Sequence, residues 1–130
     1  MSWSLLFHVL HMLLILFHLF GWLWRPLRPY HFASLNLTLL SWTVLGFFFG
    51  FGYCPLTEWH WQSLMASGLA RSELPNSYVT YVFMLTLDQK EPPRNELVFD
   101  VVVAVATVGV WIVSFVLLRR DFCSSHKESV

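Results

Sequence analysis

The stretch LVFDVVVAVATVGVWIVSFVLL, residues 97–118, decides the fold class of this chain. It contains 22 residues and a single charged side chain, Asp100, near its start. Because a helix of about 20 apolar residues crosses the hydrocarbon core of a bilayer, this stretch is predicted to span a membrane. Residues 5–24 and 35–53 carry no Asp, Glu, Lys or Arg and are nearly as long, so we predict two further spans there.

The composition of the whole chain agrees with a membrane protein and excludes other classes. Of the 130 residues, 56% are hydrophobic and 12% are charged, against about 25% charged in an ordinary soluble domain. So apolar a chain is not disordered, a net charge of +0 provides no basic patch for nucleic acid, and two cysteines make no disulfide scaffold. We therefore predict an all-α integral membrane helical bundle, with a single domain over residues 1–130.

The positive charges predict how the bundle is oriented. Five basic residues lie in the short segment 25–34 and in the tail 119–130, namely Arg25, Arg28, Arg119, Arg120 and Lys127. Cytoplasmic segments carry the excess of Lys and Arg, so both segments are expected inside. The N-terminus and the long loop 54–96 are then expected outside.

The long loop is predicted to contain one or two short helices. Pro55 has no N–H to donate, so we expect the second span to end at about Cys54 and Thr57 to cap a new helix. Apolar residues recur on one face of that helix, at Trp61, Leu64, Met65, Gly68 and Leu69. The apolar segment 78–87 is too short to span and is expected to form a second interfacial helix.

Gly46 and Gly50 form a small-xxx-small pattern in the second span. Such patterns let membrane helices approach one another closely, so this face is predicted to pack against another helix. The alternative is that glycine is simply frequent in membrane helices.

The expected topology gathers most of the unusual polar residues at one depth in the outer leaflet. They are His8, His11, Cys54, Glu58, His60 and Asp100. Ionisable groups inside a membrane seek partners, and one expected pair is His11 with Asp100. Two interpretations stay open, a hydrogen-bonded network that fixes helix register or a site that binds a ligand.

A metal or haem site is a third interpretation of the same residues. Ligands from His11, Cys54 and His60 would suit copper or zinc, and a haem would need histidines from two helices, such as His11 and His60. The chain has no Cys-x-x-Cys and no His-x-x-x-His spacing, so no cofactor is predicted. His31, in the expected inner loop, has no expected partner.

Residues 54–58, CPLTE, resemble the signature of a bacterial family of small multi-pass membrane proteins, domain-of-unknown-function family 2784. The longer run GYCPLTEWHW, residues 52–61, resembles a branch found in Bacteroidota-type bacteria. The resemblance covers residues 5–118. It implies a helical protein of the bacterial inner membrane and implies no activity.

The predicted function is non-enzymatic, a membrane-embedded binding or assembly component whose polar cluster faces the outer leaflet. One alternative is a redox protein that binds a metal or haem, and another is an enzyme that acts on a lipid-soluble substrate. The lipid bilayer is the first expected partner. Three spans make a thin bundle, so a second copy or another membrane protein is also expected, and nucleic acid is not.

The orientation makes a direct prediction for the tail. A cysteine engineered into residues 119–130, with Cys54 and Cys123 replaced by Ser, should resist a membrane-impermeant maleimide in intact cells, because the positive-inside rule places the tail in the cytoplasm. The same cysteine should react once the cells are opened. Labelling of intact cells would show that the orientation is inverted.

Overall fold

The computed structural model describes residues 3–128 of the chain and the side chains of residues 3–125. Lys127, counted above in the basic tail, has its side chain outside that range. The described residues form helices and connecting turns and contain no strand. The helices are α1 (Trp3–Phe20), α2 (Arg28–Leu40), α3 (Gly46–Phe49), α4 (Pro55–Ala66), α5 (Tyr78–Thr86) and α6 (Glu96–Glu128).

Three helical segments are long and apolar enough to cross a membrane, which confirms the all-α fold class with three candidate spans. They are Trp3–Leu23, Arg25–Phe49 and Glu96–Ser125. The second segment begins ten residues earlier than predicted, so the expected inner loop 25–34 is mostly helix. Pro26 and Pro29 each occupy a first-turn position of a helix, where the missing N–H costs nothing. The prolines therefore start helices here and do not mark a loop.

The second span also ends earlier than predicted, at Phe49. Gly50 has φ of 112° and Gly52 has φ of 81°, and glycine adopts this left-handed region without a steric penalty. The chain turns there, so Pro55 does not end the span. Pro55 is instead the first residue of α4, with Cys54 at the N-cap, and Thr57 is buried inside that helix.

Gly46 and Gly50 shape the C-terminal end of their own span. The atoms nearest to a Cβ built on Gly46 belong to Phe51 and Gly52, at 3.5 Å and 3.7 Å, and Gly50 has none within 4 Å. The Gly50 N–H bonds to the Gly46 carbonyl at 2.9 Å. Within the described chain these glycines let the next turn fold back, and they do not seat a second helix.

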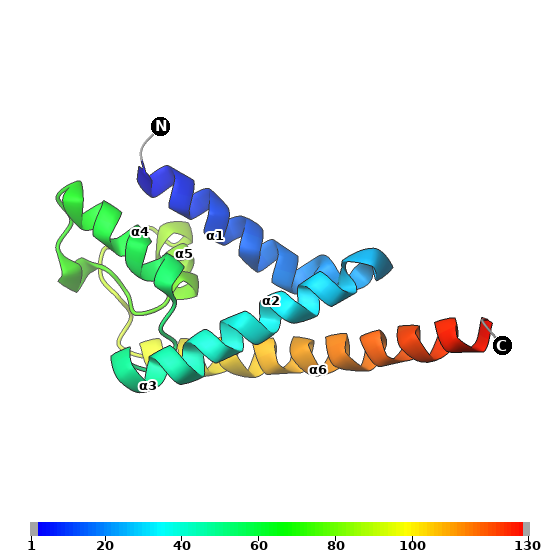
Figure 1. Ribbon diagram of the computed structural model, residues 1–130. Coiled ribbons are helices and arrows are strands. Elements are labelled where there is room, and N and C mark those ends of the chain that lie inside the picture. The colour runs from blue at the N-terminus through cyan, green and yellow to red at the C-terminus, as the bar shows by residue number, and fades with distance from the viewer. Residues whose placement is uncertain (1–2, 129–130) are drawn as a thin grey trace.

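The helices form a bundle that is closed at one end and wedged apart at the other (Figure 1). Helices α2 and α6 lie side by side, whereas α1 meets them at the end where α2 begins and diverges from there. The short helices α4 and α5 occupy the opposite end, with α4 against α1 and α5 against the start of α6. We call these the closed end and the loop end. The two expected loop helices are confirmed, but they pack against the sides of the spans.

His31 ties the three spans together near the closed end. Its side chain is fully buried, its Nε2 donates to the His18 carbonyl at 2.9 Å, and its Nδ1 lies 3.0 Å from the Ser114 hydroxyl. His18 itself lies 2.9 Å from the Ser34 hydroxyl. These bonds join α1, α2 and α6. The expectation that His31 lacks a partner was therefore wrong, because residues 28–40 are helix and carry His31 into the bundle.

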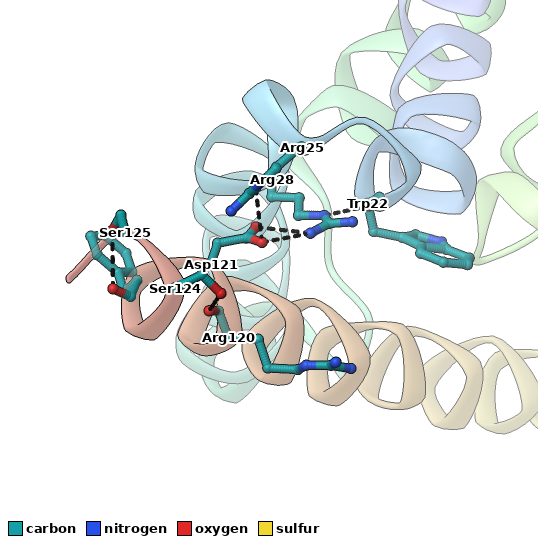
Figure 2. A network of polar contacts seen from close by, with 8 residues as sticks. Trp22, Arg25, Arg28, Arg120, Asp121, Ser124 and Ser125 are labelled. Atoms are coloured by element: carbon teal, nitrogen blue, oxygen red, sulfur yellow. Dashed lines mark hydrogen bonds and ion pairs between the residues drawn. The ribbon is translucent and has the colours of Figure 1, made fainter. Parts of the chain in front are cut away.

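An ion-pair network fastens the closed end (Figure 2). Arg28 donates to both carboxylate oxygens of Asp121, at 3.0 Å and 2.8 Å, and its Nε donates to the Trp22 carbonyl. Arg25 adds a third contact to Asp121 at 3.1 Å. Both Arg28 contacts to Asp121 come from one nitrogen, Nη1, and such charge-assisted bonds are stronger than neutral ones, so they fix the end of α6 against the turn between α1 and α2.

Gly21 is predicted to be required for this packing. A Cβ at Gly21 would lie 2.7 Å from the His31 ring and 3.0 Å from the Phe17 ring, so Gly21→Ala should lower the free energy of unfolding by about 1–3 kcal/mol through overpacking. Thermal unfolding of the full chain in detergent measures this. Gly109→Ala is the matched control, because Gly109 is helical with nothing within 4 Å. Equal melting temperatures for the two variants would contradict the prediction.

Candidate functional site

The six polar residues singled out in the sequence divide into two groups. His8, His11 and His60 meet Tyr78 and Tyr81 of α5, and we call these five residues the His/Tyr cluster. Cys54, Glu58 and Asp100 instead line a cavity on the other side of α4. The predicted single cluster is therefore two neighbouring features that share helix α4.

The His/Tyr cluster is a packed aromatic core. The His11 ring stacks on Tyr78 with centroids 3.8 Å apart, and the Tyr78 hydroxyl lies 2.7 Å from His8 Nδ1. His60 is buried and stacks on Trp61. Met12 and Ile15 of α1 pack against the core formed by Trp61, Leu74 and Tyr78, so α4 and α5 reach well along the side of the first span.

Burial shifts the pKa values of the three cluster residues that lie outside the spans, His60, Tyr78 and Tyr81. Burial, aided by His8, lowers the pKa of His60 to about 4, and burial raises the pKa of Tyr78 to about 12. Burial also raises the pKa of Tyr81. These groups are neutral near pH 7, since desolvation disfavours the charged form. The cluster is therefore a hydrogen-bonding and packing unit at neutral pH.

The three residues predicted as possible metal ligands do not lie together. Cys54 lines the cavity, whereas His11 and His60 both surround Tyr78. Within residues 3–125 no group of three or more His, Cys, Asp or Glu is placed to hold a metal ion. The ligand set His11, Cys54 and His60 is thus not formed.

The cavity lies at the loop end, between the end of α3, helix α4 and the start of α6. Its volume is about 640 Å³, within the range of small-molecule sites. Aromatic rings come from Phe49, Phe51, Tyr53 and Trp61, and polar groups from Cys54, Glu58, Gln62, Arg71, Asn76 and Asp100. A smaller hollow of about 30 Å³ adjoins it beside Trp42 and Val103.

Specific hydrogen bonds hold the walls of the cavity. The Ser41 hydroxyl, in the π-helical turn Ser41–Leu45, donates to the Tyr53 carbonyl at 2.9 Å, which holds the glycine-rich turn against the second span. The Asn76 amide donates to Glu96 at 2.8 Å, which ties the segment before α5 to the start of α6. Ser77 then caps α5 by accepting from the Thr80 N–H. The walls are therefore fixed at three points.

Two buried polar atoms on the cavity-lining residues lack a partner in the described structure. They are the Asp100 Oδ1 and the Trp61 indole N–H. Leaving such groups unsatisfied costs about 1–3 kcal/mol each. His11 Nδ1 is also unpartnered, so the expected pair of His11 with Asp100 is not formed, because Tyr78 occupies the face of the His11 ring.

The remaining charged groups of the lining have incomplete partners. Arg71 uses one nitrogen, Nη1, to donate to the Leu74 carbonyl at 2.8 Å. Glu58 accepts a 3.3 Å bond from Gln62. Each side chain thus retains bonding capacity for a ligand, since a guanidinium has five N–H donors and a carboxylate about four acceptor sites.

Sequence comparison assigns the chain to a family. Residues 3–117 match the family described as Protein of Unknown function (DUF2784). The chain belongs to this family. No curated protein and no solved structure matches it. The DUF2784 match covers the first two candidate spans, both loop helices and the third candidate span up to residue 117, so the cavity lies within the matched region.

Sequence reasoning missed Tyr78, Tyr81, Arg71 and Asn76. All four lie in the long loop, where no regular pattern connects them to the spans. The predicted helix over residues 78–87 does place Tyr78 in a first turn, and Ser77 is a good N-cap residue for it. Nothing in the sequence shows that this helix packs on α1.

The burial of His60 predicts how stability depends on pH. The pKa of His60 is about 4 in the folded chain, against an ordinary value of 6.5, so as pH falls below 6.5 the unfolded chain binds a proton first and stability is lost progressively down to about pH 4. Melting temperatures in detergent from pH 7 to pH 4 should fall less steeply in His60→Leu.

The matched control is Gln62→Leu, an exposed position on the same helix. That variant should keep the pH dependence of the unchanged protein. An equally steep fall in His60→Leu would show that His60 does not contribute.

Proposed function

We propose that this DUF2784 protein is a non-enzymatic, multi-pass binding component of the bacterial inner membrane. Its cavity would take an amphiphilic ligand at the outer leaflet. The observation that carries the proposal is the cavity of about 640 Å³, lined by the carboxylates of Glu58 and Asp100, the guanidinium of Arg71 and four aromatic rings.

The position of the cavity supports an amphiphile. It opens where two candidate spans end, at Phe49 and near Leu97. Phe49 is 66% exposed and Leu97 is 70% exposed, and both lie on its lining. Apolar side chains at the membrane end of a cavity suit an acyl chain, while the charged groups of its lining suit a polar head.

The distribution of charge supports the orientation. Arg25, Arg28 and Arg120 lie together at the closed end (Figure 2), and the cavity lies at the opposite end. By the positive-inside rule, the closed end faces the cytoplasm and the cavity faces the outside.

The separation of the two features supports binding over catalysis. A general acid or base works best with a pKa near the operating pH. The three histidines at the loop end belong to the His/Tyr cluster, where the pKa of His60 is about 4. The cavity lining contributes carboxylates, a guanidinium, amides and aromatic rings, which are recognition groups.

Protection of Cys54 tests the proposed function. In a Cys123→Ser background Cys54 is the sole cysteine, and it lines the cavity. Adding lipid extracted from bacterial membranes to delipidated protein in detergent should slow labelling of Cys54 by a maleimide several-fold, because a bound ligand covers the thiol.

The control is a triple variant, Ser67→Cys with Cys54→Ser and Cys123→Ser, whose single cysteine lies outside the cavity. Ser67 is exposed at the end of α4, so its labelling should not change. If lipid leaves the rate at Cys54 unaltered, or slows both sites alike, the cavity is not a binding site.

A further inference from the structure

The length of helix α1 limits how its residues can be placed in a bilayer. The first candidate span, Trp3–Leu23, has 21 residues, which is about 31 Å of helix at 1.5 Å per residue. The hydrocarbon core is about 30 Å thick, and α1 runs at an angle to α2 and α6 (Figure 1). Because a tilted helix covers less depth than its length, the whole of α1 is needed to cross the core. No turn of α1 is left over to stand in water.

The loop between the second and third spans reaches α1 well below its first turn. His8 lies five positions after Trp3 and Ile15 lies twelve positions after it, about 8 Å and 18 Å along the helix. The Tyr78 hydroxyl lies 2.7 Å from His8 Nδ1, and the His11 ring stacks on Tyr78. Ile15 packs against the core that contains Tyr78. Tyr78 therefore lies at the depth of the hydrocarbon.

Helix α5 then leads back toward the surface. Phe83 packs against Phe99 with ring centroids 4.9 Å apart, and Phe99 lies three positions after Glu96, where α6 begins. Asp88, two positions beyond the end of α5, is exposed. The chain is thus deepest near Tyr78 and shallower at Phe83.

The charges of the loop lie where such a path would meet water. Residues 74–87 contain no Asp, Glu, Lys or Arg. Arg71 and Glu73 precede this stretch and Asp88 follows it, and all three are exposed. Charged side chains are costly in hydrocarbon, so the uncharged stretch between them is the part of the loop that suits lipid.

The irregular backbone of the loop is also protected as lipid requires. Hydrocarbon supplies no hydrogen bonds, so non-helical backbone is tolerated there only where protein buries it or where it lines a cavity. Leu74 is 3% exposed and Pro75 is fully buried, and Pro75 has no N–H to satisfy. The turn 50–54 lines the cavity, and the Ser41 hydroxyl donates to the Tyr53 carbonyl within it.

We propose that residues 74–87 form a re-entrant segment, which enters the leaflet at the loop end, turns at Tyr78 and returns to the same surface through α5. Its partner is the acyl chains of that leaflet, which would contact Val79 and Leu85. Val79 is half-buried and Leu85 is 56% exposed, and both continue the exposed apolar surface of α1 and α6. This path is deeper than the interfacial position that the sequence predicts, and it does not depend on what the cavity binds.

Spin labels in vesicles test the depth of the segment. The full chain, with Cys54→Ser and Cys123→Ser, receives one cysteine at a time, as Val79→Cys, Leu85→Cys, Leu69→Cys or Val105→Cys. Each variant is labelled with a nitroxide in detergent and reconstituted into phosphatidylcholine vesicles. Oxygen concentrates in hydrocarbon and a polar nickel chelate stays in water, so the ratio of their collision rates with the nitroxide reports depth. The ratio at Val79 should be several-fold higher than at Leu69, with Leu85 between the two.

Leu69 and Val105 are the matched controls. Leu69 is an apolar residue of the same loop, 39% exposed in the turn between α4 and α5, and Val105 is 68% exposed in the third candidate span. The ratio at Val79 should approach that at Val105. Without a spin label, Val79→Cys should react several-fold more slowly than Leu69→Cys with N-ethylmaleimide, which crosses the bilayer, because the reactive thiolate is disfavoured in hydrocarbon. This second measurement puts no bulky label into the packing of α5.

The outcomes decide the inference independently of the proposed function. A collision ratio at Val79 no higher than at Leu69, or equal maleimide rates at these two positions, overturns it and places α5 in water. A higher ratio at Leu85 than at Val79 also overturns it, because the segment would then be deepest at its other end. Lipid protection of Cys54 can be present or absent in each of these cases, so the binding function stands or falls by its own experiment.

Discussion

The bonds of His31 are the constraint on which the bundle depends. In a segment that crosses lipid, a buried polar side chain must find its partners within the protein, because no water is there to supply them. His31 does so by bonding to the His18 carbonyl on α1 and the Ser114 hydroxyl on α6. One side chain thereby sets the distance and register of three helices. Gly21 allows the contact, since any larger residue would meet the His31 ring.

A bundle fastened at one end has to be filled at the other. The ion pair of Arg28 with Asp121 adds to the fastening, and from that end α1 diverges from α2 and α6 (Figure 1). Helices α4 and α5, together with Leu74 from the segment between them, fill the space with a core of Trp61, Leu74 and Tyr78. The cavity lies on the far side of α4 from α1, against the ends of α3 and α6. Its polar lining is therefore a consequence of how the loop between the second and third spans folds back against the bundle.

Much of the fold was predictable because hydrophobic length is a local property. Residues 97–118 can be recognised as a span without knowing their neighbours, and the short helices followed from the prolines and the apolar spacing. The ends of the helices were less accessible. Pro55 is predicted from the sequence to end the second span, but it begins α4, since proline also starts helices. Gly50, which the sequence predicts to pack against another helix, instead turns the chain together with Gly52 through their positive φ values.

The sequence by itself determined that the chain forms apolar helices, and it showed where the charged residues lie along the chain. Those properties depend only on residue type and on spacing in the sequence. The pairing of His31 with Ser114, 83 positions away, and the separation of His11 from Asp100 were settled by packing. The contact of His11 with Tyr78 depends on how a loop helix lies against a span. Such contacts join segments far apart in the sequence, and no local pattern encodes the relative rotation and depth of those segments. The residues that line the cavity could therefore be identified only from the tertiary structure.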